Sequence, residues 1–286
     1  MPARPLQLWQ GLLLALMLAA TLFPVFWLTM TAVKPPIDWN ASPAVWIPKE
    51  PTLINFQTLF DPDAIRAYGV GGVSQAATKA VFGSLLASIV STAVSVGLGL
   101  ISAIGLSRYS TPGRATPLVI LSGRMFPPAA IAVPFVIIFS LTNLMDTYTG
   151  LIAVYIAVTL PFSTWMLKSF VDELPREIEE AAMLDGKSRL RAHFTVTVPL
   201  IKGGLFATTM LVFILNWSEY MFAQVLSNTR LATIPVQLVK YVTATAGTLY
   251  GVQAALAVAA MAPLIAGGFF IQSHLARGLT FGAIKK

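Results

Sequence analysis

The sequence predicts an all-α integral membrane protein with six transmembrane helices, and three observations support this fold class. The 286 residues are 56% hydrophobic and only 11% charged, whereas about a quarter of the residues in a soluble domain are charged. Apolar runs of about 20 residues, the length that crosses the hydrocarbon core, recur along the whole chain. Each run must be helical, because an isolated strand in lipid would leave its backbone groups unpaired.

Six segments meet this length requirement. The predicted spans lie at 11–33, 80–106, 117–141, 147–169, 200–225 and 252–275. The first is too long for a signal-peptide core and has no convincing cleavage site, so we expect it to be retained. In the second span, Ser91, Ser95, Gly99 and Ala103 recur every four residues. This spacing places small side chains on one helix face, where another backbone can approach closely.

The distribution of Lys and Arg predicts that both termini face the cytoplasm. The chain carries 19 of these cations and a formal net charge of +7. If the N-terminus is inside, twelve cations lie on the cytoplasmic side and six on the other, with Arg124 within a span. This bias follows the positive-inside rule, so the charge needs no nucleic-acid partner. The absence of cysteine excludes disulfides, thiolate metal sites and cysteine nucleophiles.

The long outer loop, 34–79, is rich in Pro, Asp and aromatic residues. Its prolines favour extended or turning backbone over helix. Two interpretations are open: the loop is a cap that meets an extracytoplasmic partner, or it is an inert connector.

The cytoplasmic loop, 172–199, predicts a short surface helix, a sharp turn and a return to the membrane. Pro175 suits the first position of a helix, and the glutamates that follow it suit the positive end of the helix dipole. Gly186 suits a helix end that requires left-handed backbone. Gly186-Lys187-Ser188 matches the end of a phosphate-binding P-loop, but Ala181 stands where that motif needs glycine. On these physical grounds alone, an interfacial helix that merely links two spans is an equal alternative.

The spacing of the loop resembles a known family motif. The segment Glu180–Pro199 reads EAAMLDGKSRLRAHFTVTVP, and it resembles the EAA loop of permease subunits of binding-protein-dependent ABC importers. The family prefers Ile and Leu where this chain has Val196 and Val198. Four further segments resemble, in order, carbohydrate permeases of the maltose-system type: Phe26–Pro35, Arg124–Pro128 in a proline-broken third span, Asn216–Tyr220 and Gly278–Lys285.

The resemblance implies the type I ABC importer permease fold, as a single transmembrane domain over 1–286 with a cytoplasmic coupling helix. It also implies a surface on which an ATPase subunit docks. The residues of that surface would be Glu180, Ala181, Ala182, Asp185 and Gly186.

The resemblance further implies a set of partners in a bacterial inner membrane. These are a second permease subunit in a heterodimer, two copies of an ABC ATPase, an extracytoplasmic solute-binding protein, membrane lipid and a small carbohydrate substrate. ATP and Mg would bind to the ATPase subunits. This chain would itself carry no cofactor, no metal and no catalytic residue.

Four polar or aromatic residues are candidates for the substrate path: Arg124, Asn216, Trp217 and Glu219. An aromatic plate beside amide and carboxylate groups suits a sugar, whose faces alternate C–H and hydroxyl groups. Core packing is the alternative for Trp217. For Arg124, the alternative is a structural arginine that snorkels or bonds carbonyls freed by the prolines after it.

A self-contained, gradient-driven secondary transporter is the alternative function. Such a carrier usually needs intramembrane carboxylates as a relay, and only Glu219 and Asp146 are available. His193 and His274 show no metal-ligand spacing, and we expect them to contact solvent or lipid headgroups. No clustered His, Asp and Glu set or serine–base pairing supports a membrane enzyme.

Overall fold

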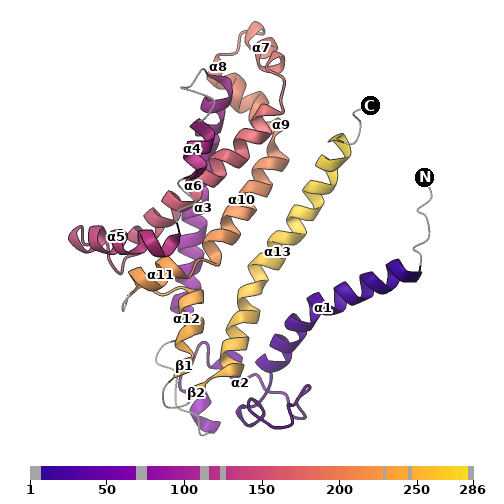
Figure 1. The fold of residues 1–286 in the computed structure, drawn as a ribbon, viewed down its shortest axis with the longest axis vertical. Helices are drawn as coiled ribbons and strands as arrows, with labels where there is room; N and C mark the ends of the chain where they lie inside the picture. Colours follow the sequence, from indigo (N-terminus) through magenta and orange to yellow (C-terminus); the bar gives the residue numbers. More distant parts are fainter. Residues whose placement is uncertain are drawn as a thin grey trace. The chain divides into compact units, whose positions relative to one another are not determined.

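The computed structural model describes the backbone of residues 8–68, 76–109, 116–122, 127–227, 230–243 and 247–282, and their side chains except at 117, 118, 121, 243 and 270–282. These ranges are mostly helical (Figure 1). The elements are α1 (Leu8–Ala32), α2 (Ile54–Gln57), α3 (Thr78–Arg108), α4 (Thr116–Ser122), α5 (Pro128–Leu141), α6 (Tyr148–Asp172), α7 (Glu177–Leu184), α8 (Arg189–Ala192), a π-helix (His193–Thr197), α9 (Val198–Leu200), α10 (Lys202–Trp217), α11 (Met221–Leu226), α12 (Ile234–Lys240), β1 (Val242–Thr243), β2 (Gly247–Thr248) and α13 (Tyr250–Gly282), with 3₁₀ turns at Pro36–Asp38 and Ala64–Tyr68.

Four helices in the described ranges are long and apolar enough to cross a membrane. They are α1, α3, α6 and the part of α13 from Tyr250 to Phe269, which correspond to the first, second, fourth and sixth predicted spans. The third predicted span, 117–141, is divided between α4 and α5, because Pro127, just before α5, has a non-helical ψ of 129°. Pro127 and Pro128 begin α5. Proline lacks an N–H and is tolerated in a first turn, so it starts a helix rather than continuing one.

The fifth predicted span, 200–225, is also interrupted. The helix from Arg189 to Leu200 meets α10 at an angle of 77°. A second break separates α10 from α11, and there the Glu219 carboxylate accepts hydrogen bonds from the backbone N–H groups of Phe222 at 2.9 Å and Ala223 at 3.1 Å. These N–H groups belong to the first turn of α11 and have no partner within that helix. The single helix expected here was wrong because a side chain of the span itself starts a new one.

The chain forms two compact units. The first comprises Met1–Lys79 with Gln237–Ala262, and the second comprises Ala80–Val236 with Pro263–Lys286. The first unit holds α1, the outer loop and the start of α13, and the second holds most of the remaining helices, including α7 and α8.

In the first unit, the outer loop folds onto the end of α1. The Asn55 side-chain amide donates hydrogen bonds to the backbone oxygens of Ala32 at 2.9 Å and Lys34 at 2.8 Å. The Trp39 indole N–H donates to the same Lys34 oxygen at 3.2 Å. A Cβ at Gly251 of α13 would lie 2.5 Å from Trp39 Nε1 and 2.6 Å from Asn55 Nδ2. This part of the loop is therefore folded against the end of α1, and its role as a cap that meets an extracytoplasmic partner stays a prediction.

In the second unit, the small-residue face of α3 packs against α6, as the spacing predicts. All four of its members are buried: Ser91, Ser95, Gly99 and Ala103. The Ser95 hydroxyl lies 2.9 Å from the Thr159 hydroxyl, and the Ser163 hydroxyl donates to the Ser95 backbone oxygen at 2.7 Å. A Cβ at Gly99 would lie 2.4 Å from Ser163 Oγ. Small side chains and hydroxyl hydrogen bonds hold membrane helices together where lipid offers no hydrophobic driving force.

This contact predicts opposite outcomes for two glycines in α3. Gly99→Val should destabilise the protein by about 1–3 kcal/mol, because the new side chain has no room against α6. Gly97→Val is the matched control, because a Cβ there meets nothing within 4 Å. The measurement is thermal unfolding in detergent. Equal melting temperatures for the two variants would contradict the packing described here.

Candidate functional site

The helix α7 forms the centre of the loop at 172–199 and lies with α8 at one end of the second unit (Figure 1). It begins at Glu177, two residues after Pro175. Gly186 has a φ of +87°, which confirms the predicted left-handed end. The Gly186 N–H donates to the Met183 oxygen at 3.0 Å, and the Lys187 N–H donates to the Ala182 oxygen at 3.2 Å. This pair of bonds is the Schellman arrangement that closes a helix sharply.

The predicted docking residues divide into two groups in the structure. Glu180, Ala181, Asp185 and Gly186 are exposed. Ala182 is only 7% exposed and faces inward, so it supports the helix rather than its outer surface. The exposed four present a small, uncrowded surface, and a Cβ at Gly186 would meet nothing within 4 Å.

A buried ion pair lies beneath this surface. Arg108, the last residue of α3, donates from Nε to Oε1 of Glu179 at 2.8 Å. The Arg108 and Glu179 side chains are 7% and 8% exposed. Arg108 also donates from Nη2 to the Leu174 backbone oxygen at 3.1 Å. Two charges with so little access to water require close partners, and here they provide them for each other.

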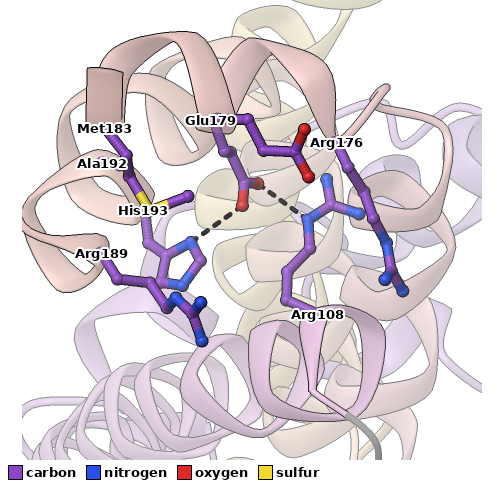
Figure 2. Close-up of a pocket in the computed structure, with 8 residues that line it drawn as sticks. Arg108, Arg176, Glu179, Met183, Arg189, Ala192 and His193 are labelled. Atoms are coloured by element: carbon purple, nitrogen blue, oxygen red, sulfur yellow. Dashed lines mark hydrogen bonds and ion pairs between the residues drawn. The ribbon is translucent and has the colours of Figure 1, made fainter. Parts of the chain in front are cut away.

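The second oxygen of the carboxylate faces the segment that leads back to the membrane. His193 Nδ1 lies 3.2 Å from Glu179 Oε2, so that Glu179 sits between His193 and Arg108 (Figure 2). Thr197 donates its hydroxyl to Glu179 Oε1 at 2.6 Å, and Tyr109 lies 3.2 Å from His193 Nε2. Glu179 therefore joins α3, α7 and the π-helix.

The expected position of His193 was wrong, because its residue is 3% exposed rather than in contact with solvent or headgroups. Its partner Tyr109 is 84 residues away in the sequence. No local pattern signals such a contact. The structure does not describe the side chain of His274, so the expectation for this residue stays a prediction.

These contacts determine the ionisation of Glu179. Burial alone would raise the pKa of its carboxyl. Hydrogen bonds from Thr197 and Arg108, with the charges of Arg108 and His193, outweigh burial and hold that pKa below its ordinary value. Glu179 is therefore a carboxylate at neutral pH.

A cavity of about 190 Å³ opens beside the ion pair. Its lining includes three arginines, Arg108, Arg176 and Arg189, together with Glu179 and Glu180. Within the described residues, no three His, Asp or Glu side chains are placed to hold a metal ion.

The predicted path residues lie elsewhere in the second unit. Asn216 is 2% exposed, and its side-chain amide donates to the Thr92 hydroxyl at 3.2 Å. Trp217 is 5% exposed and stacks on Phe213 with ring centroids 5.6 Å apart. Glu219 lies before α11 and its carboxylate accepts from the N–H groups of the first turn of that helix. All three have structural contacts, and Arg124 lies outside the described residues.

Asp146, the other carboxylate considered for a proton or sodium relay, is also held by backbone groups. Its two carboxylate oxygens accept hydrogen bonds from the N–H groups of Arg230 and Leu231, both at 2.8 Å. The Asp146 N–H donates to the Leu226 oxygen at 2.9 Å. These bonds fasten the turn before α6 to the segment after α11.

Comparisons with known proteins agree on one class. A family model described as "Binding-protein-dependent transport system inner membrane component" matches residues 95–281. The sulfoquinovosyl glycerol transport system permease protein SmoH of Agrobacterium fabrum is 32% identical over 273 residues, covering 95% of this chain and 91% of that protein. The trehalose/maltose transport system permease protein MalG of Thermococcus litoralis is 31% identical over 274 residues, covering 94% of each.

A solved structure shares the fold. It is the crystal structure of a bacterial ABC transporter involved in the import of the acidic polysaccharide alginate. The TM-score is 0.70 at 20% sequence identity, and the match covers 92% of this chain and 94% of that chain.

The buried ion pair predicts a pH-dependent effect of Glu179→Gln. At neutral pH the variant should lose about 3–5 kcal/mol of stability, because Arg108 is left buried without its partner. The pKa of the Glu179 carboxyl is lower in the folded protein than its ordinary value of 4.5, which applies to the unfolded chain. The stability that the ionised carboxylate contributes is therefore fully present above pH 4.5, and it is lost as the pH falls through the folded-state pKa. The melting temperatures of wild type and variant in detergent should therefore converge below that pH.

Glu177→Gln is the matched control, because it removes an exposed carboxylate from the same helix. Its melting temperature should follow that of wild type throughout. A gap between wild type and Glu179→Gln that is constant from pH 7 to the acid limit would contradict the prediction.

Proposed function

We propose that this chain, which belongs to the family of binding-protein-dependent transport system inner membrane components, carries a sugar, oligosaccharide, polyol or sugar derivative. Its family makes it a permease subunit of an ABC importer and not an enzyme. The family works with further permease, ATPase and binding-protein chains. Membership favours an ATP-driven importer over a gradient-driven carrier.

The proposal on cargo follows from the relatives. The permease of Agrobacterium fabrum is named for sulfoquinovosyl glycerol transport, and that of Thermococcus litoralis for trehalose and maltose transport. Both cover more than nine-tenths of this chain. The path role of Arg124, Asn216, Trp217 and Glu219 stays a prediction.

We propose that α7 is the element on which the ATPase docks. The observation that carries this proposal is an eight-residue helix whose exposed face is held on a buried ion pair. A docking element must keep its conformation when a partner chain pushes on it. The Schellman end of α7 and the buried ion pair between Glu179 and Arg108 both fix that conformation. Glu180, Ala181, Asp185 and Gly186 would contact the ATPase, with Ala182 packed behind them.

The proposed assembly has a definite composition. A second permease subunit pairs with this chain, which acts as one transmembrane domain, and two ATPase copies bind ATP and Mg. An extracytoplasmic solute-binding protein delivers the solute. This chain itself then needs no cofactor.

We also propose that α7 and both termini face the cytoplasm. The chain contains no cysteine, so single cysteines can be introduced without background. Lys49→Cys in the outer loop should react with a membrane-impermeant maleimide in intact cells. Glu173→Cys, just before α7, should react only after the membrane is permeabilised. Both positions are exposed, and the opposite labelling pattern would reverse the orientation.

Purification of the tagged chain from its native membrane tests the importer assembly. Wild type should carry along an ATPase and a second permease, identified by mass spectrometry. Gly186→Trp should lose the ATPase, because the indole would occupy the exposed end of α7. Uptake of a sugar by the intact complex in liposomes should require ATP.

Gly186→Ala is the control for the backbone. It shares the cost of left-handed backbone, about 1–2 kcal/mol, but adds almost no bulk, so it should retain the ATPase. Recovery of wild type alone, with uptake driven by a proton or sodium gradient, would overturn the proposed function. Equal retention of ATPase by wild type and Gly186→Trp would overturn the docking surface.

A further inference from the structure

We propose that the Glu179–Arg108 ion pair is a positioning contact that makes α7 and the last turn of α3 move as one body. A displacement of α7 by its partner would then pass directly into a membrane-spanning helix. The inference rests on the proposed function, because it requires that an ATPase moves α7.

The contacts between α3 and the α7 segment form a continuous set. Besides the ion pair, Arg108 donates to the Leu174 backbone oxygen at 3.1 Å. In the opposite direction, Arg176 donates from Nη2 to the Ser107 backbone oxygen at 2.7 Å. The Ser107 hydroxyl also donates to the Asp172 carboxylate. The end of α3 is thus hydrogen-bonded both to the residues that precede α7 and to Glu179 within α7.

The carboxylate of Glu179 extends this body to the π-helix. Thr197 donates to it at 2.6 Å and His193 faces it at 3.2 Å. Any rotation of α7 away from α3 or from the π-helix would separate these groups inside the protein. Separation leaves a buried charge without its partner, which is strongly unfavourable.

The covalent links of α7 are the competing route for the motion. Four residues, from Glu173 to Arg176, join α6 to α7, and another four, from Asp185 to Ser188, join α7 to α8. If α7 pivoted on these short links, the ion pair would only stabilise the loop. The two mechanisms differ in what happens to transport when the ion pair is removed but the ATPase still binds.

The first experiment compares Glu179→Gln with Glu177→Gln in the complete complex in liposomes, where uptake per ATP hydrolysed is measured. The ATPase should remain bound to Glu179→Gln while uptake per ATP falls at least about fivefold, the lower end of typical coupling between sites. Glu177→Gln should match wild type, because Glu177 is exposed on the same helix. An unchanged ratio in Glu179→Gln would overturn the inference.

A double variant separates positioning from stability. Arg108→Gln with Glu179→Gln leaves no uncompensated buried charge, so its melting temperature should recover relative to either single variant. Its uptake per ATP should stay low, because a neutral amide pair holds α7 less firmly. Recovery of the ratio together with the melting temperature would show a merely structural role.

The second experiment measures first the protein with the ion pair intact, and this measurement does not depend on how the Glu179 variants fold. Spin labels on Ile101→Cys, 61% exposed on α3, and Glu177→Cys on α7 report one distance by pulsed electron resonance. That distance should stay constant when ATP is added to the complex, and it should broaden when Glu179→Gln is introduced. A distance that changes with ATP while the ion pair is intact would overturn the inference.

These outcomes are distinct from failure of the proposed function. A wild-type complex without an ATPase would contradict the function itself. A wild-type complex that couples ATP to uptake, beside a Glu179→Gln complex that couples equally well, would contradict the positioning contact alone.

Discussion

The buried ion pair between Glu179 and Arg108 is the constraint on which the end of the second unit around α7 depends. Both side chains are less than a tenth exposed, so neither charge has water to stabilise it. Removal of either partner leaves the other in a medium of low dielectric, where an unpaired charge is costly. The last turn of α3, the helix α7 and the π-helix must therefore take positions that keep the pair intact. Because the ion pair must stay intact, it also fixes the orientation of the exposed surface of α7.

The membrane-spanning part of the unit follows a different rule. Lipid provides no hydrophobic drive for helix association, so small residues and side-chain hydrogen bonds have to bring helices together. Gly99 lets α6 approach α3, while Asn216 donates to Thr92 across α3 and α10. Where a helix is interrupted, backbone groups must find a partner within the protein. Glu219 provides that partner at the start of α11.

These two rules suit a permease, which performs no chemistry and works by changing shape. Side-chain hydrogen bonds join α3 to α6 and α3 to α10. Non-helical residues at Pro127 and between α10 and α11 divide two of the expected spans into shorter pieces. Around α7, a buried polar network replaces the apolar packing of the spans. The ATP-consuming step belongs to a partner, and the contribution of this chain is mechanical.

The sequence by itself determined the features that depend on neighbouring residues. The apolar character of the long helices, the small-residue face of α3 and the left-handed end at Gly186 all arise from local spacing and backbone preference. The tertiary structure alone decided the inward position of Glu179 and His193, because their partners Arg108 and Tyr109 lie 71 and 84 residues away. The break before α11, by contrast, involves a local contact, because Glu219 accepts from N–H groups only three and four residues later. Whether Glu219 faces a solute or caps a helix depends on where its carboxylate points, and composition carries no record of that direction.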